Sequence, residues 1–68
     1  MIKLDQFLKF LGIAQTGGQA KHMIVDGEVK VNGTVETRRG KKLVTGDKVT
    51  VGTQTFEVGD LEEKIHSS

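Results

Sequence analysis

The 68-residue chain contains no cysteine, proline, tryptophan or tyrosine. Without cysteine it can form neither a disulfide framework nor a thiolate zinc site, so packing alone must stabilise the fold. Without proline, tight turns must depend on the nine glycines, which tolerate a positive φ. A chain of this length has room for one small core, which excludes a multidomain enzyme.

Groups that carry out catalysis are also scarce. The two serines, Ser67 and Ser68, stand at the very end, so the rest of the chain has only threonines as hydroxyl nucleophiles. His22 precedes Asp26 by four residues, a helical spacing that suits a base with its orienting carboxylate or two metal ligands. Two ligands do not complete a metal site. We therefore expect no catalytic residue, metal, cofactor or small-molecule substrate.

Long apolar runs are absent as well. No segment approaches the roughly 18 apolar residues that span a bilayer. The N-terminus lacks the basic, apolar and small-residue pattern of a secretory signal. We expect a monomeric cytoplasmic protein with no membrane partner.

The charge of the chain is segregated, although its net value is only +1. Residues 1–56 contain nine Lys and Arg against five Asp and Glu, a net of +4, whereas residues 57–68 are acidic. The densest cationic run is Arg38-Arg39-Gly40-Lys41-Lys42, here called the basic segment. Such a run attracts polyanions, although a solvated loop can have the same composition.

Hydrophobic spacing predicts two helices. Leu4, Phe7, Leu8 and Leu11 fall at i, i+3, i+4 and i+7, which indicates a first helix that ends at Gly12.

The second helix begins at Thr16, because Thr16-Gly17-Gly18-Gln19 has the spacing of a capping box in which Thr and Gln each satisfy the other's free backbone N–H. Its predicted core stripe is Ala20, Met23 and Ile24, and it ends at Gly27.

After Gly27 the hydrophobic period changes to two, which predicts strands. Val29 and Val31 point inward, and Asn32-Gly33 forms a turn. A two-residue turn would place Val35 on the solvent face, whereas a three-residue loop pairs Val31 with Val35 and Lys30 with Glu36. We predict the three-residue loop. Further strands are expected at 48–51 and 55–58, after turns at Gly46-Asp47 and Gly52-Thr53.

The predicted fold class is therefore α+β, with a helical hairpin packed on one face of a small antiparallel sheet. We assign residues 1–58 to the folded domain and residues 59–68 to an acidic C-terminal tail, in which residues 61–68 form one helical turn or fray.

Nucleic acid is the partner that the charge pattern favours. Phe7, Phe10 and Phe56 lie in or beside the apolar stripes, so we expect all three in the core and no exposed aromatic platform for bases. Recognition should then depend on phosphates and shape. The glycine pair at 17 and 18 opens the second helix, where free N–H groups suit an anion, although a close approach of the two helices would also explain it. The candidate RNA-binding residues are Lys3, Thr16, Gly17, Gly18, Lys21, Lys30, Arg38, Arg39, Lys41 and Lys42.

Several short motifs occur in an order typical of one RNA-binding family. They are Lys3-Leu4-Asp5, Leu11-Gly12, Thr16, Ala20, the run Gly27-Glu28-Val29-Lys30-Val31-Asn32-Gly33, and Gly46-Asp47. Over residues 2–58 the chain therefore resembles the S4 domain, which is named after the fourth protein of the small ribosomal subunit. Within that family, residues 16–21 and 35–43 resemble the small stand-alone bacterial members of the YaaA/YbcJ type.

The resemblance implies the alpha-L RNA-binding fold, in which the start of the second helix and a nearby basic face contact structured RNA, often ribosomal RNA. Many family members carry an arginine directly after the Ser or Thr that caps this helix, and here that position is Gly17. We expect the basic segment to compensate, which would move the centre of the RNA-binding surface toward the sheet.

Two functions are compatible with these features. The first is a non-catalytic protein that binds structured RNA, with ribosomal RNA as the expected target, in ribosome assembly or maintenance. The alternative is a protein-interaction adaptor whose basic segment docks an acidic partner, because complementary charge also serves protein partners.

Overall fold

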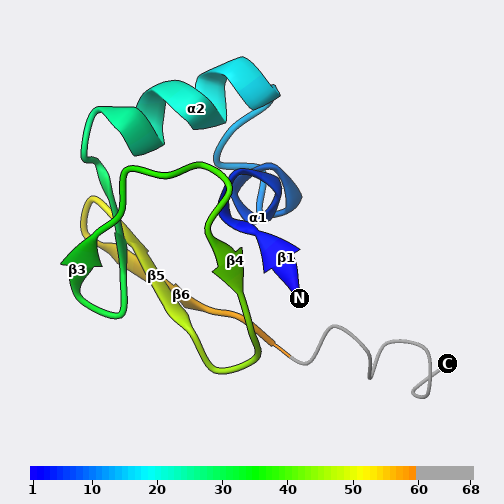
Figure 1. The fold of residues 1–68 in the computed structure, drawn as a ribbon, viewed down its shortest axis with the longest axis vertical. Coiled ribbons are helices and arrows are strands. Elements are labelled where there is room, and N and C mark those ends of the chain that lie inside the picture. Colours follow the sequence, from blue (N-terminus) through cyan, green and yellow to red (C-terminus); the bar gives the residue numbers. More distant parts are fainter. Residues whose placement is uncertain (60–68) are drawn as a thin grey trace, which may run out of the picture.

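The computed structural model describes residues 1–59 of the chain. Its elements follow the order β1 (Ile2–Lys3), α1 (Leu4–Phe10), α2 (Gly17–Val25), β2 (Val29–Val31), β3 (Thr34–Val35), β4 (Lys42–Leu43), β5 (Lys48–Val51) and β6 (Gln54–Glu57) (Figure 1). The α+β fold class with two helices and antiparallel sheets is confirmed. The predicted helical turn at 61–68 and nearly all of the acidic tail lie outside the described residues.

Both helices form where the apolar spacing places them. In α1, Leu4, Phe7 and Leu8 are buried, and the chain leaves the helix through Gly12 at φ +79°. In α2, Ala20 and Ile24 are buried, and the exit is Gly27 at φ +82°. Each glycine adopts a left-handed conformation that other residues rarely take, which ends the helix there.

Only one of the two hydrogen bonds of the predicted capping box forms at the start of α2. The Thr16 hydroxyl oxygen accepts a hydrogen bond from the Gln19 backbone N–H at 3.1 Å, as expected. The Gln19 side chain, however, reaches the backbone N–H of Gln15 at 2.8 Å and not that of Thr16. The long glutamine side chain therefore fixes the approach to the helix one residue earlier than a capping box would.

The predicted three-residue loop between β2 and β3 is wrong. The register pairs Lys30 with Val35 and Val31 with Thr34, so the turn consists of Asn32 and Gly33 alone. Both have positive φ, +53° and +85°, as in a type I′ turn, whose twist matches that of the flanking strands. This preference outweighs the burial of Val35, which is 49% exposed.

The strands form two antiparallel sheets. The larger has the order β3-β2-β5-β6, and the smaller pairs β1 with β4. The turn at Gly52-Thr53 and the strand at 48–51 occur as predicted. The turn predicted at Gly46-Asp47 lies one residue earlier, with Thr45 and Gly46 at its centre, because the Asp47 N–H donates to the Val44 carbonyl oxygen. The last strand also lies one residue earlier, at Gln54–Glu57. The short strand β1, which pairs Ile2 with Leu43, was not predicted.

One hydrophobic core joins the helices to the sheets. It draws on both helices and on β2, β4 and β5, and no polar side chain of residues 1–59 is buried. Its buried members are Leu4, Phe7, Leu8, Ala14, Ala20, Ile24, Val29, Val31, Leu43, Val49 and Val58. All chemistry available to the described residues therefore lies at the surface.

Candidate nucleic-acid interface

The basic segment is tied to the start of α1 by its backbone. The N–H of Leu4 donates to the carbonyl oxygen of Lys41 at 2.8 Å, and that of Asp5 donates to Arg39 at 3.2 Å. The first N–H groups of a helix lack partners within it, and the N-cap residue of α1, Lys3, accepts none of them with its side chain. The basic segment thus supplies the missing acceptors, which holds its cations at a fixed place beside the helix.

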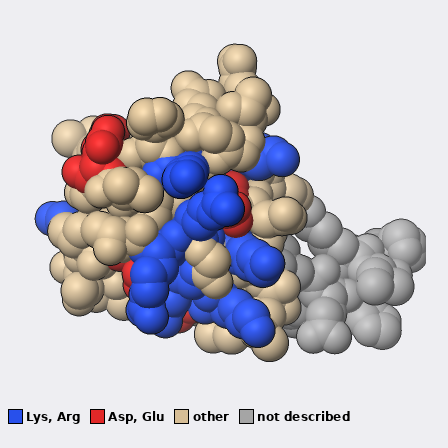
Figure 2. Space-filling model, turned by 45° about the horizontal axis from the view of Figure 1, so that its top comes forward, with Lys and Arg blue, Asp and Glu red and all other residues tan. Residues whose placement is uncertain are grey.

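The cations of this segment surround a shallow hollow. Arg38, Gly40, Lys41 and Lys42 line it. Figure 2 shows Lys and Arg side chains gathered near the middle of one face of the molecule, with few acidic side chains between them. A concave surface lined by three cations attracts phosphate oxygens.

Lys3 extends this surface across the smaller sheet. Lys3 lies directly opposite Lys42 in the ladder between β1 and β4, and both side chains are exposed. Like charges opposite each other destabilise an antiparallel pair. Within residues 1–59 the one ion pair joins Arg38 to Glu36, so no carboxylate balances these two lysines there.

Glu36 is a member of this surface that sequence reasoning missed. Its carboxylate accepts hydrogen bonds from Arg38 Nε at 3.0 Å, from Arg38 Nη2 at 3.3 Å and from the Arg38 backbone N–H at 3.0 Å. The hydrogen bond from the Arg38 side chain is the main cause that lowers the pKa of Glu36, and the same bond raises the pKa of Arg38. The pair is therefore ionised at neutral pH, and Glu36 offsets one of the four cations.

A second carboxylate, that of Asp47, accepts hydrogen bonds from two separate turns. Asp47 accepts from the Val44 N–H at 3.0 Å and from Asn32 Nδ2 at 3.2 Å. These two bonds, in that order, lower its pKa, and the charge of Lys41 adds a smaller effect in the same direction. The Asn32 Oδ1 in turn accepts from the Lys48 N–H at 2.9 Å. This network has a structural role, because it connects the turn after β2 to the turn before β5.

The start of α2 presents bare backbone. A Cβ atom placed on Gly17 would have no neighbour within 4 Å, and one on Gly18 would meet only the Thr16 hydroxyl at 3.9 Å. The close helix-to-helix approach that could have explained these glycines is therefore not found. Neither glycine has a positive φ, so the described fold gives no reason for glycine at either position.

The other candidate residues fall into two groups. Lys21 shares a second hollow with Gly18, His22 and Val25 on the outer side of α2. Lys30 is exposed on the solvent face of the larger sheet, where its ladder neighbours are Val35 and Thr50. The predicted pair of Lys30 with Glu36 is absent, because the two-residue turn pairs Lys30 with Val35 and Glu36 instead contacts Arg38. Lys30 thus lies outside both hollows.

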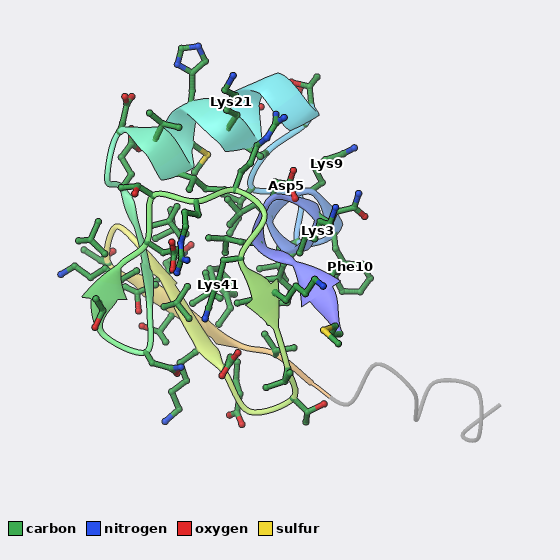
Figure 3. All side chains as sticks on the ribbon, in the orientation of Figure 1. Lys3, Asp5, Lys9, Phe10, Lys21 and Lys41 are labelled. Atoms are coloured by element: carbon green, nitrogen blue, oxygen red, sulfur yellow. The ribbon has the colours of Figure 1, made fainter. Side chains whose placement is uncertain are left out.

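Phe10 corrects the expectation that all three phenylalanines belong to the core. Phe7 is 3% exposed and Phe56 is half-buried, but Phe10 is 57% exposed. Figure 3 shows the Phe10 side chain projecting from α1. The prediction that all three phenylalanines lie in the core is therefore wrong for Phe10.

The described part of the chain offers little else for chemistry. Residues 1–59 contain no cluster of three or more His, Cys, Asp or Glu that could hold a metal ion. Neither α1 nor α2 has the length and apolar character of a membrane-crossing helix.

Comparison with known proteins gives a consistent result. The family model described as "S4 domain" matches residues 1–59. The chain is 46% identical over 59 residues to the "Probable ribosome maturation protein RlbA" of Bacillus subtilis, an alignment that covers 85% of this chain and 83% of that protein. It is 40% identical over 57 residues to the "Putative RNA-binding protein YbcJ" of Escherichia coli, which covers 84% of this chain and 81% of that protein.

Proposed function

The chain belongs to the S4 domain family, and from this premise we propose that it is a non-catalytic protein that binds structured ribosomal RNA during ribosome maturation. RNA binding is supported by the family and by the names of both relatives. The printed name of the Bacillus relative describes a ribosome maturation protein, and we extend this role to the present chain. We further propose that the protein acts as a monomer in the cytoplasm.

The observation that carries the proposal is the attachment of the basic segment to α1. Backbone hydrogen bonds from Leu4 and Asp5 keep the segment in place without using its cationic side chains. Arg39, Lys41 and Lys42 form no ion pair with any described residue. Their charges are thus available to phosphates, and the fixed backbone reduces the conformational entropy lost on binding.

The bare start of α2 supports the same function. Glycine at a helix start costs helix stability relative to alanine, and the fold leaves the space beside Gly17 and Gly18 open. A ligand that approaches the backbone closely would fill that space. A phosphate is suited to it, because free N–H groups and the helix dipole favour an anion at this end.

The test is a salt series with purified ribosomal RNA. If the protein binds through phosphates, the logarithm of the affinity should fall linearly and steeply with the logarithm of salt concentration. A folded RNA should compete better than a single strand of equal length. Absence of binding at low salt, or an affinity that does not change with salt, would contradict the proposal. Capture of an acidic protein in place of RNA would favour the adaptor function.

A further inference from the structure

Lys3 and Lys42, here called the lysine pair, form one of the two residue pairs of the β1–β4 ladder. The N–H of Leu4 donates to the carbonyl oxygen of Lys41 at 2.8 Å, and these two residues flank the lysine pair. A bond between the flanking residues makes the lysine pair a non-hydrogen-bonded one, in which the Cα atoms are about 4.5 Å apart and the side chains are close. Directly opposed side chains also share one face of the sheet.

This face of the smaller sheet points away from the core. The other pair of the ladder is Ile2 with Leu43, of which Leu43 is fully buried and Ile2 packs against the core. Side chains alternate between the two faces along a strand, so the lysine pair lies on the opposite face, and both of its side chains are exposed. The apolar pair therefore attaches β1 to the core, while two positive charges stand together at the surface.

Carboxylates offset other cations of the basic surface but not the lysine pair. Glu36 forms an ion pair with Arg38. Hydrogen bonds are the main cause that lowers the pKa of Glu36 and of Asp47, and the positive charge of Lys41 lowers both a little further. Within residues 1–59, no carboxylate forms an ion pair with either member of the lysine pair. The repulsion between its two ammonium groups is thus not offset by any described residue.

The ladder that carries the lysine pair is short. It consists of two residue pairs, and like charges directly opposite each other destabilise an antiparallel pair. A segment near the end of a chain is well ordered only where contacts tie it down. An anion between the two ammonium groups would replace one repulsion by two attractions, and would therefore strengthen the attachment of β1 to β4.

A phosphate of a nucleic-acid backbone matches this arrangement. Each ammonium group has three donors and no acceptor, and a backbone phosphate has one negative charge shared by two free oxygens. Lys42 also lines the hollow that Arg38, Gly40 and Lys41 complete. An RNA backbone that has phosphates in the hollow can therefore place a neighbouring phosphate at the lysine pair.

We propose that the lysine pair binds one phosphate of the RNA backbone between its two ammonium groups, and that this phosphate fastens β1 to β4. The inference rests on the proposed RNA-binding function and adds to it a defined phosphate site and a coupling. Because the coupling is reciprocal, RNA binding stabilises the docked strand β1, and docking of β1 raises the affinity for RNA.

The number of phosphates bound by the lysine pair can be measured in a salt series with ribosomal RNA. The double variant Lys3→Gln/Lys42→Gln should reduce the salt slope by about one unit, because one shared phosphate is lost. A loss of about two units would mean two separate phosphates, and an unchanged slope would mean no contact, so either result would overturn the inference. Lys9→Gln/Lys48→Gln is the matched control, because it removes the same charge at exposed positions outside the basic segment.

The repulsion within the lysine pair can be tested without RNA. Lys3→Gln and Lys42→Gln should each raise the midpoint of thermal unfolding, whereas Lys48→Gln, which removes the same charge opposite Glu57, should not. Inorganic pyrophosphate at constant ionic strength should raise the midpoint of the wild type more than that of Lys3→Gln. Equal rises in the two proteins would contradict a phosphate site at the lysine pair.

Hydrogen exchange shows whether the phosphate fastens β1. The Leu4 N–H crosses the ladder to Lys41, so its exchange reports on the docking of β1. The reference is the Asn32 N–H, which donates to the Lys48 carbonyl oxygen at 2.7 Å in the larger sheet. Bound RNA should slow the exchange of Leu4 more than that of Asn32. Equal slowing of both amides would overturn the coupling.

The outcomes separate this inference from the proposed function. Salt-dependent binding of ribosomal RNA that is equal for wild type and the double variant would overturn the site at the lysine pair and leave RNA binding intact. No binding of ribosomal RNA at low salt would overturn the proposed function and, with it, the RNA phosphate as the ligand. A pyrophosphate effect that persists in that case would identify a free phosphate compound as the ligand instead.

Discussion

The carboxylate of Glu36 holds the guanidinium of Arg38 through two hydrogen bonds, from Nε at 3.0 Å and from Nη2 at 3.3 Å. The Arg38 side chain is nevertheless 76% exposed, whereas that of Glu36 is 13% exposed. The arginine donors that Glu36 does not use can therefore face a ligand. The acid thus lowers the local positive charge without covering the arginine.

Replacing Glu36 by Gln should strengthen RNA binding. The variant removes one negative charge from the surface that faces phosphates, so affinity for ribosomal RNA should rise and the salt slope should steepen by about one unit. Filter binding across a salt series measures both quantities. Glu57→Gln is the control, because Glu57 is an exposed acid on β6, outside the basic segment. Weaker binding of Glu36→Gln would instead mean that Glu36 positions Arg38 for its contact.

Replacing Arg39 by Ala should weaken RNA binding and leave the fold unchanged. Arg39 is bound to α1 through its backbone carbonyl, which alanine retains. Loss of one phosphate contact should reduce the salt slope by about one unit. Lys48→Ala, which removes an equal charge at an exposed position opposite Glu57, should change the slope little. Equal effects of the two variants would show that net charge matters and the position of the basic segment does not.

The parts of the fold that depend on local patterns could be predicted from the sequence. The spacing of Leu4, Phe7 and Leu8 and the exit at Gly12 involve residues within two helical turns, so the pattern alone identifies α1. The pairing of Ile2 with Leu43 joins distant parts of the chain through two residue pairs. Such a short strand leaves no periodic signal. The turn at Asn32-Gly33 was predicted, but its length was wrong, because the burial of Val35 was given more weight than the preference of Asn-Gly for a two-residue turn.

In the candidate site, too, the sequence predicts some features and leaves others without a signal. Composition locates the cations of the basic segment, but its attachment to α1 uses backbone groups that every residue has, so no residue type indicates it. The Glu36–Arg38 pair depends on the conformation after β3, which the wrong register obscured. Phe10 did carry a signal, because position 10 lies off the 4, 7, 8, 11 stripe. Its apolar character led to the wrong prediction.

The glycines at the ends of α2 should respond oppositely to alanine. At Gly18 the added methyl group has space, and alanine is the better helix former, so Gly18→Ala should raise the free energy of unfolding by about 0.5–1 kcal/mol. At Gly27, φ is +82°, a left-handed conformation that alanine adopts at a cost. Gly27→Ala should therefore lower the free energy of unfolding by about 1–2 kcal/mol. Urea denaturation measures both. RNA affinity of Gly18→Ala should fall despite the greater stability. Unchanged affinity would argue against a close RNA contact there.

Asp47 should contribute to the stability of the fold in a way that depends on pH. Its carboxylate accepts hydrogen bonds from the Val44 N–H and the Asn32 amide, which lower its pKa below the ordinary value of 3.8. A carboxyl group with a lowered pKa in the folded state binds protons more weakly there than in the unfolded chain. It therefore contributes stability above its unfolded pKa and loses that contribution as pH falls through the folded pKa. Glu36, lowered from 4.5, acts in the same direction.

The free energy of unfolding of the wild-type protein should therefore decline as pH falls below about 4.5, with unfolding followed by urea denaturation between pH 3 and 7. Asp47→Asn removes the ionised acceptor and should cost about 1 kcal/mol at pH 7, while the difference from wild type should shrink toward acid pH. Glu28→Gln, at an exposed acid, should match the wild type throughout. A difference between Asp47→Asn and wild type that stays constant with pH would show that Asp47 acts through its shape and not through its charge, because only a charge is lost on protonation.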